Sequence, residues 1–119
     1  MPEFKTKPHI LVVCGRNKRR SRTAEYLYKN DSRLNIKSAG LSAQSEVVIN
    51  SKLVEWADLI IVMDNSQKNR IQDQFRTSNV PRIENINIED EYEYLDPELI
   101  EILKSRIENI LASISIFGN

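Results

Sequence analysis

The sequence predicts an α/β fold, a three-layer α/β/α sandwich in which helices cover both faces of a four-stranded parallel sheet. Two apolar runs rich in β-branched residues, residues 9–14 (HILVVC) and 58–63 (DLIIVM), are typical of strands buried on both faces. Each run is followed at once by a polar segment with helical spacing. Strand followed by helix, twice over, indicates right-handed β-α-β units.

The first half of the chain contributes three further elements. Residues 21–30 are expected to form a helix, and residues 35–40 a short strand. Residues 50–57 are expected to form a short helix, for which Asn50 or Ser51 is the cap. These elements link the two buried strands through short connections.

The second half adds two helices and the fourth strand. Residues 65–75 follow the second buried strand as a helix, and residues 80–86 form a strand, with Pro81 placing its start there or the strand at an edge. Asp96 as N-cap and Pro97 at the first helical position begin the last helix. Its apolar residues then repeat at helical spacing: Leu99, Leu103, Ile107, Ile110 and Ile114.

The composition is that of one soluble globular domain, residues 1–119, with 40% hydrophobic and 29% charged residues. No stretch approaches the roughly 18 apolar residues of a membrane span, and the N-terminus lacks a secretion signal. We therefore expect a cytoplasmic location and no membrane partner. Because metal-ligand spacings and nucleotide-binding motifs are absent, no cofactor is expected. His9, in or before a strand, and Trp56, on a short helix ahead of a buried strand, are interpreted as structural.

The charge is unevenly distributed although the formal net charge is zero. Five of the seven residues from Arg16 to Arg22 are basic, whereas residues 84–101 carry eight carboxylates and no Lys or Arg. Such blocks are usually solvated faces or interaction surfaces, so they support no function alone. The basic block, however, directly follows the only cysteine, Cys14.

Cys14 ends the first predicted strand, where ligands bind in parallel α/β sheets. Residues 14–20, here called the Cys14 loop, connect that strand to a helix, so backbone amides and the helix dipole can face an anion. A cysteine in such a place is activated as a nucleophile near neutral pH. Arg20, six residues later, offers a planar fork for two phosphate oxygens. Nucleophile, amides and guanidinium together predict a phosphoryl-transfer site.

The segment VVCGRNKRRSRTAE resembles the signature of the low-molecular-weight protein tyrosine phosphatases: Cys, two residues, Asn, two residues, Arg, Ser and then a helix. The resemblance extends to SAGLS after the second strand, to WADLIIVMD at the third, and to an acidic loop containing tyrosines before the last helix. It covers nearly the whole chain. It is closest to a short branch of predicted tyrosine phosphatases that ends in a DEYEY…DPEL segment.

The resemblance implies a phosphatase that hydrolyses phosphate monoesters, with protein phosphotyrosine the favoured substrate and small phosphate esters the other class. Cys14 would form a phosphocysteine, and Arg20 would bind the phosphoryl oxygens. Asn17 would hold the loop in its strained shape, and Ser21 would hydrogen-bond the Cys14 thiolate. The remaining substrate-binding positions are loop residues: Gly15, Arg16, Lys18 and Arg19.

The resemblance also implies an aspartate that protonates the leaving oxygen and later activates water. Two candidates lie in EDEYEYLDPEL. We favour Asp90, because DEY keeps Asp and Tyr at the family's spacing, with Tyr92 and Tyr94 as aromatic walls for the substrate. Asp96 keeps the Asp-Pro pair, but capping of the last helix explains its position.

The loop departs from the family pattern at three positions. Gly15 replaces an apolar residue, Arg16 replaces a glycine, and Arg19 replaces a second cysteine that some members use for redox protection. The chain is also shorter between Gly40 and Trp56, where the family has an aromatic wall of the cleft. Four basic residues have no role in the implied chemistry and are called surplus here: Arg16, Lys18, Arg19 and Arg22. They are expected to steer polyanionic substrates toward the site.

Alternative functions are considered beside the phosphatase. Related folds reduce arsenate, but with a single cysteine this chain would need an external thiol. A module that binds phosphate or nucleic acid without catalysis is the other alternative, less favoured than the enzyme, and the surplus basic residues motivate it. A third alternative is that Cys14 is a buried, inert thiol with a packing role only.

Overall fold

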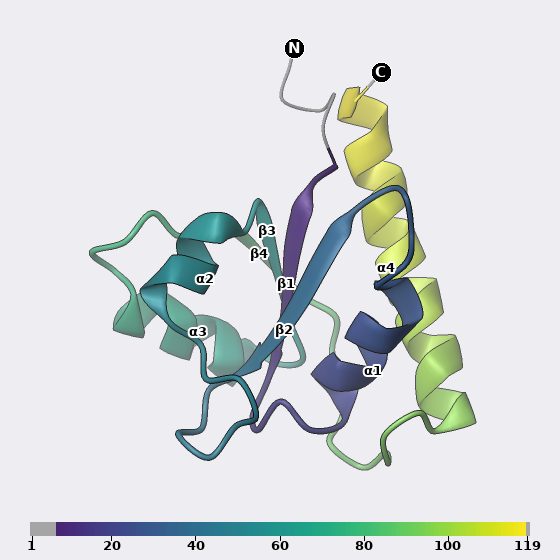
Figure 1. Cartoon of the computed structure of the whole chain (residues 1–119), viewed down its shortest axis with the longest axis horizontal. Helices are drawn as coiled ribbons and strands as arrows, with labels where there is room; N and C mark the ends of the chain where they lie inside the picture. Colours follow the sequence, from purple (N-terminus) through teal and green to yellow (C-terminus); the bar gives the residue numbers. More distant parts are fainter. Residues whose placement is uncertain (1–6, 119) are drawn as a thin grey trace.

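Four parallel strands form a sheet at the centre of the structure, a computed structural model that describes residues 7–118 and side chains as far as residue 114 (Figure 1). The strands lie in the order β2-β1-β3-β4, and every pairing is parallel. Their bounds are β1 His9–Cys14, β2 Asn35–Gly40, β3 Leu59–Val62 and β4 Arg82–Asn85. The bounds of β1 and β2 are those predicted from the sequence. Pro81 immediately precedes β4, which is an edge strand, and this position suits a proline because proline has no amide hydrogen to donate.

Helices cover both faces of the sheet (Figure 1), and in the described part of the chain there are two on each. Helices α1 (Arg20–Tyr28) and α4 (Pro97–Gly118) pack on one face, and α2 (Ser51–Trp56) and α3 (Asn65–Gln74) on the other. Alternate side chains of β1 enter two separate cores: Ile10 and Val12 face α1 and α4, whereas Leu11 and Val13 face α2 and α3. The predicted three-layer sandwich is therefore confirmed.

The helix starts differ in a way that bears on the site. Asn50 caps α2 by accepting from the Leu53 amide at 2.8 Å, and Asp64 caps α3 by accepting from the Gln67 amide at 2.9 Å. Within residues 7–118, helix α1 has no side-chain cap at its first turn. Because the first amides of a helix need an acceptor, an uncapped start directly after the Cys14 loop suits an anion.

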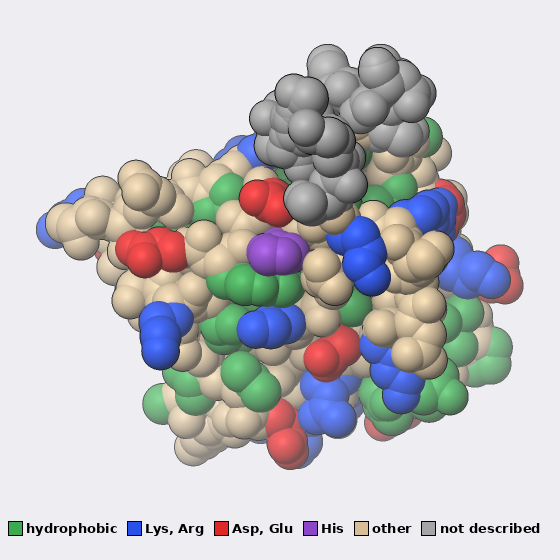
Figure 2. Space-filling view, turned by 45° about the horizontal axis from the view of Figure 1, so that its top comes forward, with side chains coloured by type: hydrophobic (Ala, Val, Ile, Leu, Met, Phe, Trp, Pro, Cys, Tyr) green, Lys and Arg blue, Asp and Glu red, His purple; other side chains and the backbone are tan. Residues whose placement is uncertain are grey.

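On the face in Figure 2, basic, acidic and hydrophobic side chains are interspersed. On the amino-end side of the sheet, the His9 ring stacks on Trp56 with centroids 4.5 Å apart, a packing role for both residues. Among the described residues, no helix is long and apolar enough to cross a membrane.

Candidate active site

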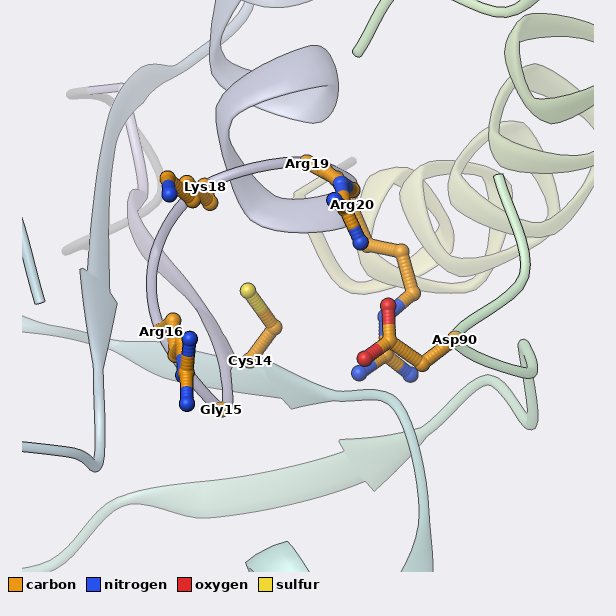
Figure 3. Close-up of a pocket in the computed structure, with 7 residues that line it drawn as sticks. All are labelled: Cys14, Gly15, Arg16, Lys18, Arg19, Arg20 and Asp90. Atoms are coloured by element: carbon orange, nitrogen blue, oxygen red, sulfur yellow. The ribbon is translucent and has the colours of Figure 1, made fainter. Parts of the chain in front are cut away.

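The Cys14 side chain faces a pocket at the carboxyl edge of the sheet, and the Cys14 loop curves around its sulfur (Figure 3). Cys14 is the last residue of β1 and is only 3% exposed, and α1 begins at Arg20. The pocket is lined by residues of the loop and by one acidic residue from the far end of the sequence: Cys14, Gly15, Arg16, Lys18, Arg19, Arg20 and Asp90.

Ser21 lies in the first turn of α1, directly against the cysteine. Its Oγ is 3.0 Å from Cys14 Sγ and accepts a hydrogen bond of 2.9 Å from Asn17 Nδ2. Since Asn17 supplies that hydrogen, the single hydroxyl proton of Ser21 remains available for the sulfur. This arrangement can stabilise a thiolate at Cys14.

Asn17 holds the loop through its backbone and its side chain. Its φ of 54° lies in the left-handed region, which Asn tolerates better than most residues, and the residue is fully buried. Besides Ser21, its Nδ2 donates to Ser38 Oγ at 2.9 Å, and its Oδ1 accepts from the Val47 amide at 3.1 Å. Ser38 in turn donates to Glu25 at 2.6 Å. The loop is thus fixed to β2, α1 and the segment after β2.

Gly40, at the end of β2, allows the loop to lie this close. A Cβ atom there would come within 2.7 Å of the Asn17 amide nitrogen and still closer to Ser45 Oγ. The position of Asn17 is held by the three hydrogen bonds of its side chain. The glycine of the SAG segment is therefore a steric requirement of the loop.

Arg20 reaches from α1 to the segment that follows β4. One of its terminal nitrogens donates to the Ile88 carbonyl at 2.6 Å, and its Nε lies 3.7 Å from Asp90 Oδ1. The residue is 5% exposed, and its buried Nε has no hydrogen-bond partner among the described residues. An unsatisfied buried donor of a guanidinium is unusual, and here it belongs to a side chain that lines the pocket.

The two candidate acids are separated by the structure. Asp90 lines the pocket, with 61% of its side chain exposed. Asp96 is not among the lining residues, and its carboxylate accepts from the Glu98 amide at 2.8 Å in the first turn of α4. The expected capping role of Asp96 is thus present in the structure, and Asp90 is the aspartate that lies near Cys14 and Arg20.

The tyrosines do not take the places expected for them. Tyr92 packs against the core between the sheet and helices α1 and α4, and it is not among the pocket-lining residues. Tyr94 is 43% exposed and is likewise absent from the pocket lining. A half-buried ring gains more from apolar packing than from standing in water beside a polar pocket. The pocket consequently has no aromatic wall among the described residues.

A second pocket adjoins the first and shares Arg20 and Asp90 with it. It lies where β3 and β4 end, and Asp64, Asn87 and Glu89 help to line it. Burial opposes ionisation of Asp64, but hydrogen bonds from Ser66 and the Gln67 amide, with the charge of Arg20, outweigh it and lower its pKa. The side of the site beyond Asp90 is thus acidic.

The sequence did not indicate several of these neighbours. The group that accepts a hydrogen bond from Arg20 is the backbone carbonyl of Ile88, and a backbone group cannot be recognised from the residue type. Asp64 is the last residue of WADLIIVMD, and nothing in that segment indicates that its side chain lies at the site. Ser38 could have been predicted as a neighbour of the Cys14 loop, because it belongs to the SAGLS segment that shares the family resemblance. Among the described residues, no group of histidine, cysteine and carboxylate side chains could hold a metal ion.

Solved structures with the same fold cover nearly the whole chain. The protein YfkJ of Bacillus subtilis has a TM-score of 0.74 at 17% identity, over 95% of this chain and 98% of its own. The YwlE arginine phosphatase of Geobacillus stearothermophilus has a TM-score of 0.72 at 18% identity, over 92% and 94%. The tyrosine phosphatase Wzb of Escherichia coli K30, in complex with sulphate, has a TM-score of 0.68 at 18% identity, over 91% and 99%.

The fold is also that of an enzyme with a different reaction. A thioredoxin-dependent arsenate reductase of Corynebacterium glutamicum has a TM-score of 0.65 at 21% identity, over 92% of this chain and 63% of its own. No protein-family model matches the sequence, and no curated protein is similar to it in sequence. The likeness therefore establishes the fold of the low-molecular-weight tyrosine phosphatases, which cysteine-dependent phosphatases and reductases share, and leaves the substrate to be argued from the site.

Proposed function

We propose that this protein is a cysteine-dependent phosphatase that hydrolyses phosphate monoesters through a phosphocysteine intermediate. One observation carries the proposal: Arg20 is buried, its Nε lacks a hydrogen-bond partner among the described residues, and it lines the same pocket as Cys14 and Asp90. A tetrahedral oxyanion above the sulfur would satisfy this donor and the uncapped start of α1 together.

In the first step, the Cys14 thiolate attacks phosphorus. An S–P bond forms, the bond from phosphorus to the ester oxygen breaks, and Asp90 gives its proton to the leaving oxygen. Arg20 and the loop amides stabilise the negative charge on the three equatorial oxygens. The Ser21 hydroxyl, 3.0 Å from the sulfur, favours the thiolate as the starting form.

In the second step, a water molecule attacks phosphorus and gives a proton to the Asp90 carboxylate. The P–S bond breaks, its electron pair returns to the Cys14 sulfur, and inorganic phosphate leaves. Asp90 is suited to both transfers because it lines the pocket beside Cys14 and is accessible to water.

The relatives support this chemistry without fixing the leaving group. Wzb was solved with sulphate and with phosphate, and a YwlE variant with serine in place of an active-site cysteine carries phosphate on that serine. One relative is a tyrosine phosphatase and another an arginine phosphatase. We propose protein phosphotyrosine as the first substrate to test, since the Cys14 loop resembles the tyrosine phosphatase signature.

Arsenate reduction is the second candidate, because an arsenate reductase shares the fold. Cys14 is the only cysteine of the chain, so an internal disulfide cannot form and an external thiol would have to supply the electrons. Oxidation of an added thiol that depends on arsenate and on Cys14 would establish that activity.

The test of the phosphatase proposal is turnover of an aryl phosphate at mildly acidic to neutral pH. Wild-type protein should release phosphate, Cys14→Ser should not, and phosphotyrosine peptides should be hydrolysed. Cys14→Ser with wild-type turnover would reject the mechanism. Binding of phosphopeptide or RNA without hydrolysis, unchanged in Cys14→Ser, would instead favour a binding module.

A further inference from the structure

The basic residues around the Cys14 loop differ in their partners. Three of the five have carboxylate neighbours at 3.7 to 3.9 Å, the pairs being Arg19 with Glu93, Arg20 with Asp90, and Arg22 with both Glu25 and Glu46. Arg16 and Lys18 form neither a hydrogen bond nor an ion pair with any residue in the described range 7–118. Two positive charges at this site are therefore left uncompensated.

Both unpaired cations belong to the pocket that contains Cys14. Arg16 and Lys18 are exposed and line it, and Figure 3 shows them across the cysteine from Asp90. Gly15, between Cys14 and Arg16, leaves free space beside them, because a Cβ atom there would meet nothing within 4 Å. A group attached to a bound phosphate would find both room and positive charge on this side.

The opposite side of the pocket has the opposite charge. Asp90 stands there, and the adjoining pocket adds Asp64 and Glu89. A second anionic group on a substrate would be repelled by Asp64 and Glu89 and attracted by Arg16 and Lys18. Of the residues that the structure describes, none that lines the Cys14 pocket offers an aromatic ring against which an uncharged leaving group could stack.

We propose that Arg16 and Lys18 form a second anion-binding subsite, which selects phosphate monoesters that carry another phosphate group close to the scissile one. The inference rests on the proposed function, and it makes that function more specific. A solvated charge run would serve solubility anywhere on the surface, whereas these two charges face the pocket in which the scissile phosphate would lie.

The experiment measures the affinity of the protein for inorganic phosphate and for pyrophosphate by titration calorimetry at fixed ionic strength. Wild-type protein should bind pyrophosphate more tightly than phosphate. Arg16→Gln and Lys18→Gln should each lower the affinity for pyrophosphate by about three- to tenfold, and that for phosphate by less. Arg16→Lys, which keeps the charge, should retain most of the preference.

Arg76→Gln is the matched control. Arg76 is an exposed cation between α3 and β4, at the amino edge of the sheet, and its loss changes the net charge equally without touching the pocket. It should leave the ratio of the two affinities unchanged. If the ratio of pyrophosphate affinity to phosphate affinity were the same in wild type, Arg16→Gln and Lys18→Gln, the proposed subsite would be wrong. Aryl phosphate turnover, measured on the same wild-type preparation, tests the phosphatase separately because anion binding does not require turnover.

Discussion

At the level of single residues, the site depends on side chains that touch one another across long sequence separations. Arg20 meets Asp90 and the Ile88 carbonyl, and Asn17 meets Ser38 and the Val47 amide. These contacts give each polar group a defined place around Cys14. Substitutions within this set should therefore separate catalysis from stability.

Asp90→Asn should reduce kcat on an aryl phosphate by about 10²- to 10⁴-fold, because the amide can neither give nor take the required proton. Steady-state kinetics on alkyl and aryl phosphates measures this, and the loss should be larger for alkyl leaving groups.

Asp96→Asn is the control for Asp90→Asn, since asparagine also caps helices well and Asp96 lies outside the pocket. Its kcat should stay within about twofold of wild type, as expected for a change away from the reacting atoms. A large loss in Asp96→Asn with little loss in Asp90→Asn would reverse the assignment.

Asn17→Ala should lower the free energy of unfolding by about 2 to 4 kcal/mol, because the Val47 amide loses its partner and alanine disfavours the left-handed backbone. Asn17→Gly should cost about 1 kcal/mol less, because glycine adopts this φ freely. Urea denaturation of both variants measures the difference. Equal losses would mean that backbone conformation contributes nothing at this position.

At the level of elements, the end of β2 lies in close contact with the Cys14 loop. Gly40→Ala should destabilise the protein by about 1 to 3 kcal/mol, because its Cβ would press on the Asn17 amide and Ser45. Gly15→Ala should change the unfolding free energy by less than about 0.5 kcal/mol, since its Cβ meets nothing within 4 Å. Thermal or urea unfolding of the pair compares them, and similar losses in both variants would contradict this contact.

Helix α4 is tied to the segment after α1 by an ionic cluster. Arg33 bonds both Asp31 and Glu108 at 2.7 to 3.0 Å and lowers the pKa of each carboxyl. The bound carboxylates stabilise the folded state above the ordinary pKa values of 3.8 and 4.5, and this contribution is lost as pH falls through the lower folded values.

Arg33→Gln should therefore destabilise the protein near neutral pH, by less than about 1 kcal/mol because the cluster is largely exposed. The difference from wild type should shrink as pH falls below about 4, where both carboxyls become protonated. Urea midpoints measured from pH 7 to pH 3 test this, and a difference that grew toward acid pH would have the wrong sign.

Across the complete chain, the sequence was sufficient for the architecture because local signals agreed with the fold. β-branched apolar runs marked β1 and β3, Pro97 marked the start of α4, and Cys14 stood at a strand end. The sequence was not sufficient for Tyr92, since the choice between core and pocket depends on tertiary packing. Nor could it show that Arg19 has a partner and Arg16 has none among the described residues, because the partner, Glu93, is distant in sequence.

The proposed covalent intermediate can be observed by mass spectrometry. Asp90→Asn, incubated briefly with an aryl phosphate and quenched in acid, should carry one phosphoryl group on the peptide that contains Cys14, because the second step is slowed. Cys14→Ala should carry none. Turnover without phosphorylation at Cys14, or a phosphoryl group on another residue in both variants, would contradict the phosphocysteine mechanism.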